Sequence, residues 1–148
     1  MSLAAVSASE RRLLDKLAPI GRCSIEQLLS GPGLLRLHQA LGNALPASNE
    51  ELQARWTKDD PAAIRSISVF STWLGRVAGD LVLAHGSWGG VVICGGVIER
   101  IGTALDVAAF RSGFEDKAPF TADLAAVPVW TVKHPHPALL GLARLALG

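Results

Sequence analysis

The sequence predicts a helix-rich α/β fold that contains a short pair of parallel strands. Two apolar runs, at residues 91–94 and 129–132, have the length and β-branched composition of buried strands. Between them lie two helical patterns, which begin near Val97 and after Asp106. This order favours parallel pairing through a right-handed crossover. Because two strands make no independent sheet, either the sheet continues in sequence outside these 148 residues or the chain is the helix-rich remainder of a larger domain.

Helix start signals recur through the first third of the chain. A serine followed three residues later by glutamate or glutamine can cap a helix through its hydroxyl while the longer side chain reaches back. A Ser-Gly-Pro-Gly stretch at residues 30–33 is expected to break the chain before the next helix. These signals predict a first helix that Ser9 caps and that ends at Leu17, because Pro19 and Gly21 follow. They also predict a single helical turn after Ser24, a helix over residues 34–41 and a short helix after Ser48.

A long amphipathic helix is predicted from Pro61 to about Gly86. Asp60 is a capping residue, and proline suits the first helical position that follows it. Gly75 and Gly79 lie one turn apart on one side of this helix, where they allow another backbone to approach closely. The apolar stripe expected to face the core consists of Ile67, Phe70, Leu74, Val77, Leu81 and Ala84.

Composition excludes several classes of protein. The net charge is +1 and no basic run exceeds two residues, so we expect no nucleic-acid partner. Arg65, Arg76 and Asp80 interrupt the longest apolar helix, which argues against a membrane span. The mean hydropathy of +0.32 is high, which predicts apolar surface for a partner lobe or a second copy. With that surface uncovered, the chain is expected to self-associate, most simply as a homodimer.

The two cysteines predict a cytoplasmic protein with reduced thiols. Cys23 and Cys94 form no Cys-x-x-Cys pattern and no leader segment precedes them, so both are expected to be buried as small apolar residues. The length suits one domain over residues 1–148, of which residues 1–3 are an expected non-native extension.

The remaining polar and aromatic features point to structural roles. No phosphate-loop, dinucleotide, zinc-protease or nucleophile-elbow motif is present. His134 and His136 flank prolines before a terminal helix that ends near Leu147, so a capping or turn role is preferred to a metal site. The Phe-Glu-Asp-Lys stretch at residues 114–117 is interpreted as a helix-end charge cluster, and the four tryptophans as core or interface anchors.

Gly95 and Gly96 follow the first predicted strand directly. Two glycines at the carboxyl end of a buried strand leave bare backbone against which a flat ligand such as a nucleotide can lie. A plain strand-to-helix turn explains the pair equally well in the absence of other information.

Several ordered blocks resemble the C-terminal part of bacterial glucokinases. They read IEQLLSGPGLLRLHQAL, SVFSTWLGRVAGDLVLAHGSWGGVVICGGVIER, FRSGFEDKAPF and VPVWTVKHPHPALLGLA, and they cover residues 9–146 in the family's order. Two positions depart from the family pattern: Ala118 and Ala138 stand where loop glycines are usual. The departures concern local backbone shape rather than the fold.

The resemblance implies a sugar kinase of the hexokinase–actin type, in which two ribonuclease-H-like lobes close over glucose and ATP. This chain is then the C-terminal lobe. Gly95 and Gly96 would form the adenosine motif, and Arg100 would flank the adenine. Ser30, Gly31 and Gly33 would either contact the nucleotide or serve only the loop. Glu26 would accept hydrogen bonds from sugar hydroxyls, although a solvated first-turn acid is the alternative.

The resemblance also implies what this chain lacks. The phosphate-binding loop, the aspartate that takes the proton from the attacking hydroxyl and a further segment that holds glucose would belong to an N-terminal lobe, so no catalytic residue or metal ligand is expected in this chain. The intact parent protein would use ATP with Mg²⁺. A second hypothesis is an inert sugar-sensing or dimerisation module of a regulatory fusion protein. A third, a plain helical interaction domain, leaves the ordered blocks unexplained.

Overall fold

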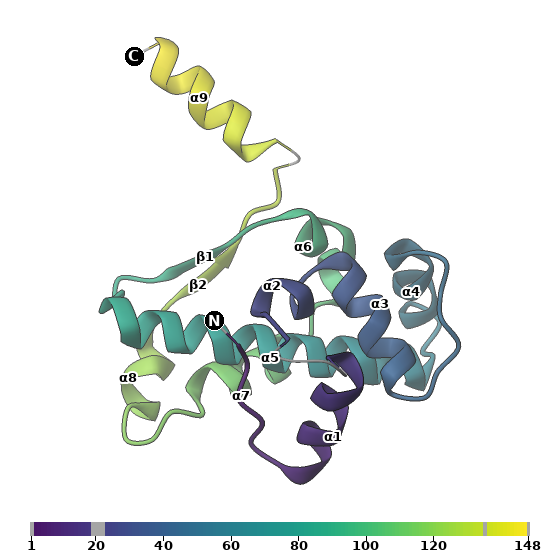
Figure 1. The fold of residues 1–148 in the computed structure, drawn as a ribbon. Helices are drawn as coiled ribbons and strands as arrows, with labels where there is room; N and C mark the ends of the chain where they lie inside the picture. Colours follow the sequence, from purple (N-terminus) through teal and green to yellow (C-terminus); the bar gives the residue numbers. More distant parts are fainter. Residues whose placement is uncertain (1, 19–22, 135, 148) are drawn as a thin grey trace.

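The computed structural model describes residues 2–18, 23–134 and 136–147 and confirms a helix-rich α/β fold. The 25-residue helix α5 runs through the middle of the molecule, and the other elements lie around it (Figure 1). Along the chain the elements are α1 (Ala8–Leu17), α2 (Ile25–Leu28), α3 (Gly31–Ala40), α4 (Asn49–Trp56), α5 (Pro61–His85), β1 (Val91–Ile93), α6 (Gly96–Ile101), the 3-10 helix η1 (Gly102–Ala104), α7 (Val107–Glu115), α8 (Thr121–Ala126), β2 (Val129–Thr131) and α9 (Pro137–Leu147).

The two strands pair in parallel, as the order of elements predicts. Val91 lies opposite Val129 and Ile93 opposite Thr131, and α6, η1, α7 and α8 form the connection between the strands. Each strand is one residue shorter than predicted. Helix α8 and the 3-10 turn were not expected from the sequence, because neither is long enough to show a periodic pattern.

The helix caps agree with the sequence in most places. The Ser24 Oγ accepts from the Gln27 N–H at 3.1 Å, and the Ser24 N–H donates to Gln27 Oε1 at 3.0 Å. The cap of α1 is Ser7 rather than Ser9, because the Ser7 Oγ accepts from the Glu10 N–H. Helix α3 begins at Gly31, not at Leu34, since the serine of the Ser-Gly-Pro-Gly stretch is its cap and proline fits its first turn. The proposed stop signals of α1, Pro19 and Gly21, lie outside the described residues.

Helix α5 is buried on two sides, which makes its core face wider than the predicted stripe. Leu81 is 42% exposed and Ala84 is also exposed, so the prediction is wrong for the end of the helix. Trp73 and Val82, which are not part of the predicted stripe, are buried. A single stripe cannot describe a helix that packs against α7 on one side and against the N-terminal helices on another. The stripe residues that are buried are Ile67, Phe70 and Val77.

Three glycines bring α5 and α7 into close backbone contact, and we call them the glycine seam. The prediction of close packing at Gly75 and Gly79 is confirmed, and Gly113 of α7 completes the seam. A Cβ atom at any of them would overlap a backbone carbonyl oxygen of the facing helix. The overlaps are between Gly75 and Phe110, Gly79 and Phe114, and Gly113 and Thr72.

By length and composition alone, α5 is apolar enough to cross a membrane in spite of the charges that interrupt it. Its position is that of a core helix, because more than half of its apolar window is buried inside the molecule. Two of the charges that interrupt it are paired with other elements. Arg76 lies 2.8 Å from Glu10 of α1, and Asp80 lies 2.8 Å from Lys117.

Apolar side chains remain exposed outside this core. Helix α9 projects away from the rest of the molecule (Figure 1), and its Leu142 and Leu145 are 62% and 82% exposed. Cys94, the residue after β1, is exposed, contrary to expectation, whereas Cys23 is partly buried. Trp88 is also exposed, so not every tryptophan is a core anchor.

Candidate functional site

The glycine pair lies where β1 ends and α6 begins. Gly95 has φ +126°, a conformation that L side chains rarely adopt, and Gly96 is the first residue of the helix. Both are exposed, and a Cβ at either position would have no heavy atom within 4 Å. Unlike the glycine seam, this pair is not required by packing against a neighbour. Its bare backbone faces open space, the condition for close approach by a flat ligand.

The glycines at the start of α3 have different surroundings. The Ser30 Oγ accepts from the Gly33 N–H at 3.1 Å. A Cβ on Gly33 would overlap the backbone of α2, so the absence of a side chain there serves the turn itself. Gly31 is buried, and its Cβ position lies 2.8 Å from Asn49 Nδ2 and 3.8 Å from a terminal nitrogen of Arg100. The structure therefore brings Gly31 and Arg100 together, whereas Gly33 has an architectural role.

Arg100 sits in the last turn of α6, beside the start of α4. Its Nε lies 3.6 Å from Glu50 Oε1, and both side chains are more than half exposed. The pKa of Glu50 is held below its ordinary value by its own backbone N–H, by the Ser48 hydroxyl and by the charge of Arg100. An exposed pair of this kind contributes little to stability, so the guanidinium is free to turn toward a ligand.

Asn49 was missed by the sequence analysis. It is 5% exposed, and its Oδ1 is buried with no hydrogen-bond partner in the part of the chain that the structure describes. Gly31 lies beside both Asn49 and Arg100, so Asn49 belongs to the same junction of α3, α4 and α6. In sequence it appears only as the first residue after a capping serine, which gives no indication of a buried polar group.

Glu26 lies in the first turn of α2 and is exposed. The capping box uses its neighbours, Ser24 and Gln27, as predicted. Within the described residues no hydrogen bond or ion pair occupies its carboxylate, so both oxygens can accept. Ser30, the cap of α3, follows four residues later, so Glu26 lies on the segment of chain that leads directly into α3.

The other polar candidates keep their structural roles. The His136 N–H donates to the Nδ1 of His134 at 3.0 Å, as in a turn. At the end of α7, Glu115 pairs with Arg111 at 2.6 Å, while Phe114 is buried. Among residues 2–18, 23–134 and 136–147, no group of three or more histidine, cysteine, aspartate or glutamate side chains could hold a metal ion.

Gly95 and Gly96 thus lie at the start of α6, and Arg100, with Gly31 beside it, lies in the last turn. The helix rises only about 9 Å along its axis. With that geometry in place, comparison with known proteins gives one family: the glucokinase family model matches residues 1–148. The chain belongs to the glucokinase family. The predicted resemblance is confirmed over its whole length.

Glucokinases from several bacteria are similar to this chain. The glucokinase of Xanthomonas campestris pv. campestris (strain B100) is 39% identical over 144 residues, which are 93% of this chain and 43% of that protein. The glucokinase of Xylella fastidiosa (strain 9a5c) is 38% identical over 143 residues, with 93% and 42% covered. This chain therefore spans less than half the length of these relatives.

A solved glucokinase confirms the fold class. The crystal structure of glucokinase from an Antarctic psychrotroph matches with a TM-score of 0.81 and 28% identity. The match covers 100% of this chain and 48% of that one. The predicted helix-rich α/β arrangement with a short parallel pair, of the actin and hexokinase type, is thus that of half a glucokinase.

Proposed function

We propose that this chain is the C-terminal lobe of a glucokinase that transfers a phosphoryl group from ATP to O6 of glucose. Its part is to supply the adenosine-binding surface and one sugar-binding carboxylate. The observation that carries the proposal is the open backbone of Gly95 and Gly96, which no packing contact requires, on the same short helix as Arg100. Membership of the glucokinase family supports ATP as the ligand of this surface.

The proposed nucleotide contacts follow from the residues themselves. Bare backbone at Gly95 and Gly96 lets the adenosine lie at van der Waals distance, and the planar guanidinium of Arg100 can stack on an aromatic base. Ser30 and Gly31 lie at the junction of α3, α4 and α6, whereas Gly33 packs against the backbone of α2. In the intact parent protein ATP would bind together with Mg²⁺, an ion that proteins usually hold through substrate phosphates and one or two carboxylates.

Glu26 is the proposed sugar ligand. An ionised carboxylate has two acceptor oxygens and can take one hydrogen bond from each of two neighbouring hydroxyls. Its exposure and its unoccupied oxygens support this role. The general base and the phosphate-binding loop belong to the N-terminal lobe, so this chain alone is expected to phosphorylate nothing.

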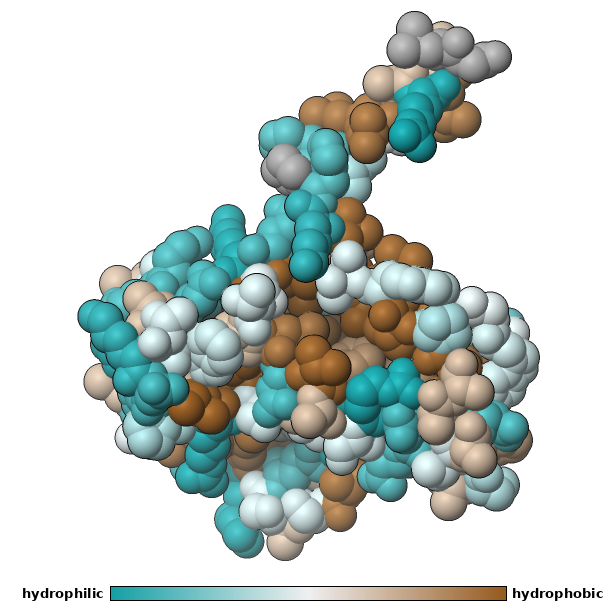
Figure 2. Space-filling model, turned by 180° about the vertical axis from the view of Figure 1, so that it is seen from behind, coloured by the Kyte–Doolittle hydropathy of each residue, from teal (hydrophilic) through white to brown (hydrophobic). Residues whose placement is uncertain are grey.

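Exposed apolar surface supports the proposal that this chain contacts a partner lobe. Figure 2 shows apolar side chains gathered in a hollow on the back of the molecule, below the projecting C-terminal segment. A cavity beside β2 is lined by Ile98, Leu105, Val107 and Thr131, and Val107 is 66% exposed. A parallel pair needs further strands to be stable. We assign this hollow and the leucines of α9 to contact with the N-terminal lobe, in a cytoplasmic enzyme that forms a homodimer.

The sugar role is tested by Glu26→Gln in the intact parent protein. Glutamine replaces one acceptor oxygen with an NH₂ donor, and a hydrogen bond to a charged group is worth about 1.5–3 kcal/mol. Calorimetric titration should therefore show glucose affinity reduced roughly ten- to a hundredfold, with ATP affinity nearly unchanged. Asp123→Asn is the matched control, because Asp123 is another exposed first-turn acid. Equal glucose affinities of wild type and Glu26→Gln would reduce Glu26 to a solvated helix-start acid.

The nucleotide role is tested by Gly96→Ala. The added methyl group meets no protein atom and Gly96 has no positive φ, so the variant should fold normally. It should nevertheless lose ATP affinity, because the methyl group occupies the surface on which the adenosine would lie. Gly89→Ala is the control, since Gly89 also faces open space. An unchanged ATP affinity of Gly96→Ala would show that the glycine pair is only a turn.

A further inference from the structure

A second cavity lies on the other side of α5 from the glycine pair. It has a volume of about 420 Å³ and lies between α1, the end of α3 and the first half of α5. Figure 1 shows α1 and α6 on opposite sides of α5, so this cavity is separate from the proposed nucleotide surface. Its apolar walls are the partly buried side chains of Leu13, Leu41 and Val69.

Glu10, which lines the cavity, belongs to a largely buried ion pair. Glu10 Oε1 accepts from Arg76 at 2.8 Å and from the Trp73 indole N–H at 2.5 Å, and Oε2 accepts from the Val6 N–H at 2.7 Å. Burial alone would raise the pKa of Glu10, but these three donors outweigh it and the pKa is lowered. The Glu10 charge is therefore balanced by Arg76 and needs no cation from the cavity itself.

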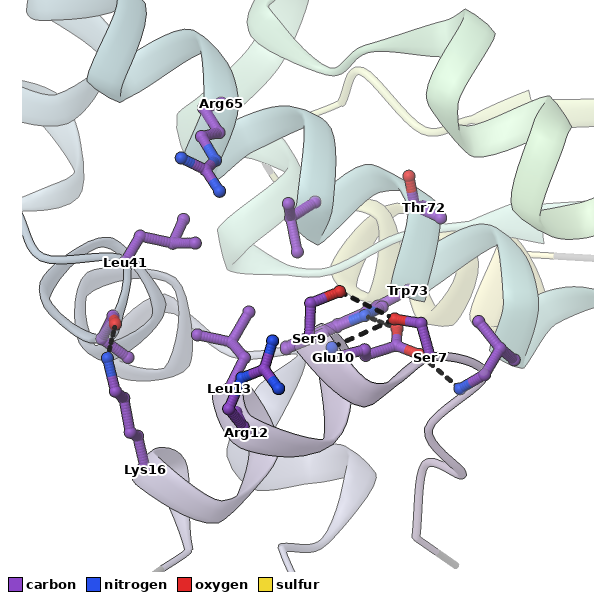
Figure 3. Close-up of a pocket in the computed structure, with 13 residues that line it drawn as sticks. Ser7, Ser9, Glu10, Arg12, Leu13, Lys16, Leu41, Arg65, Thr72 and Trp73 are labelled. Atoms are coloured by element: carbon purple, nitrogen blue, oxygen red, sulfur yellow. Dashed lines mark hydrogen bonds between the residues drawn. The ribbon is translucent and has the colours of Figure 1, made fainter.

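Three further cations line the cavity without a balancing acid. Arg12 and Lys16 lie one turn apart on α1, and Arg65 extends from α5 toward them (Figure 3). All three are exposed, and within the part of the chain that the structure describes none is in an ion pair. Lys16 Nζ is held by the carbonyl of Ala40 at 3.2 Å, which keeps its charge at the rim. Like charges one helical turn apart repel, so the arrangement favours an added anion.

We propose that this cavity binds a small organic anion with an apolar body. A phosphate or carboxylate group would lie between Arg12, Lys16 and Arg65, where guanidinium groups can donate paired hydrogen bonds. The apolar body would lie against Leu13 and Leu41. The volume is within the range of ligand pockets and suits a molecule of about one ring.

Isothermal titration calorimetry with phenyl phosphate tests the proposal on the 148-residue chain, with phenylacetate as the carboxylate arm. Saturable binding of one equivalent is expected for at least one of these anions and none for phenol, which lacks the charge. Whichever of the two compounds binds more tightly shows whether the cavity prefers a phosphate or a carboxylate group. Arg12→Gln combined with Arg65→Gln should weaken that binding roughly tenfold or more, because each loses charge-assisted hydrogen bonds.

The matched control combines Arg11→Gln with Lys58→Gln, which removes the same net charge from exposed positions outside the cavity. Binding by this control should equal that of wild type. The single variant Arg65→Lys keeps the positive charge, so it should bind the anion more tightly than the double glutamine variant of Arg12 and Arg65. Equal weakening by both double variants would overturn the proposal in favour of general charge attraction, and so would a failure of both anions to saturate. Neither glucose nor ATP is present, so the result is independent of the proposed kinase function.

Discussion

Replacing Gly75 with alanine should destabilise the protein, although alanine is the better helix former. In an open helix this change would gain about 1 kcal/mol. At the glycine seam the new methyl group would overlap the carbonyl oxygen of Phe110, which belongs to the backbone of α7 and cannot turn away as a side chain can. The two helices must therefore separate.

The cost can be worked out from what the seam holds together. Phe110 and Phe114 are 3% and 0% exposed, and burial of such a side chain is worth about 1.5–3 kcal/mol. A gap of about 0.5–1 Å forfeits a quarter to a half of the contact energy, so the two rings lose about 2 kcal/mol. Overpacking strain adds about 2 kcal/mol. After subtracting the gain in helix propensity, the net loss is about 3 kcal/mol.

Urea unfolding followed by far-ultraviolet circular dichroism measures this loss. With a slope of about 2 kcal/mol per M, the midpoint of Gly75→Ala should fall by about 1.5 M. Gly141→Ala in α9 is the control, because its Cβ would meet open space, and it should be neutral or slightly stabilising. A midpoint for Gly75→Ala equal to that of wild type would refute the close contact between α5 and α7.

Three further outcomes are expected. Glu10→Gln should lower the free energy of unfolding by about 3 kcal/mol, since it leaves Arg76 buried without its counter-charge; a loss below about 1 kcal/mol would contradict this. Burial lowers the pKa of His38, so as pH falls His38 is protonated in the unfolded chain before it is protonated in the folded protein. The free energy of unfolding should therefore decline as pH falls below about 6.5. His38→Asn should flatten that decline in urea titrations between pH 5 and pH 8, and an unchanged slope would exclude His38 as its cause. Burial raises the pKa of the Cys23 thiol, so a thiol reagent should label exposed Cys94 first; faster labelling of Cys23 would contradict the burial.

Much of the fold could be predicted because its signals are local. The capping box at Ser24 and the start of α5 at Asp60 depend on hydrogen bonds within one turn, so a few neighbouring residues determine them. The parallel pair followed from the order of strands and helices. The ordered blocks of residues predicted the family, because each block preserves a local pattern in register.

What could not be predicted depends on distances between segments far apart in the chain. Gly33, Gly75 and Gly96 are alike in sequence, yet the first two are packed against backbone and the third faces open space. Gly31 lies beside Arg100, 69 positions further on, only because α3, α4 and α6 meet. Likewise, the cavity lined by cations from α1 and α5 has no counterpart in any local pattern. Local hydrogen bonds and periodicity act within a turn or two, so the sequence by itself determines elements and their order. Which elements come into contact, and which side chains they leave free, is decided by packing of the whole chain.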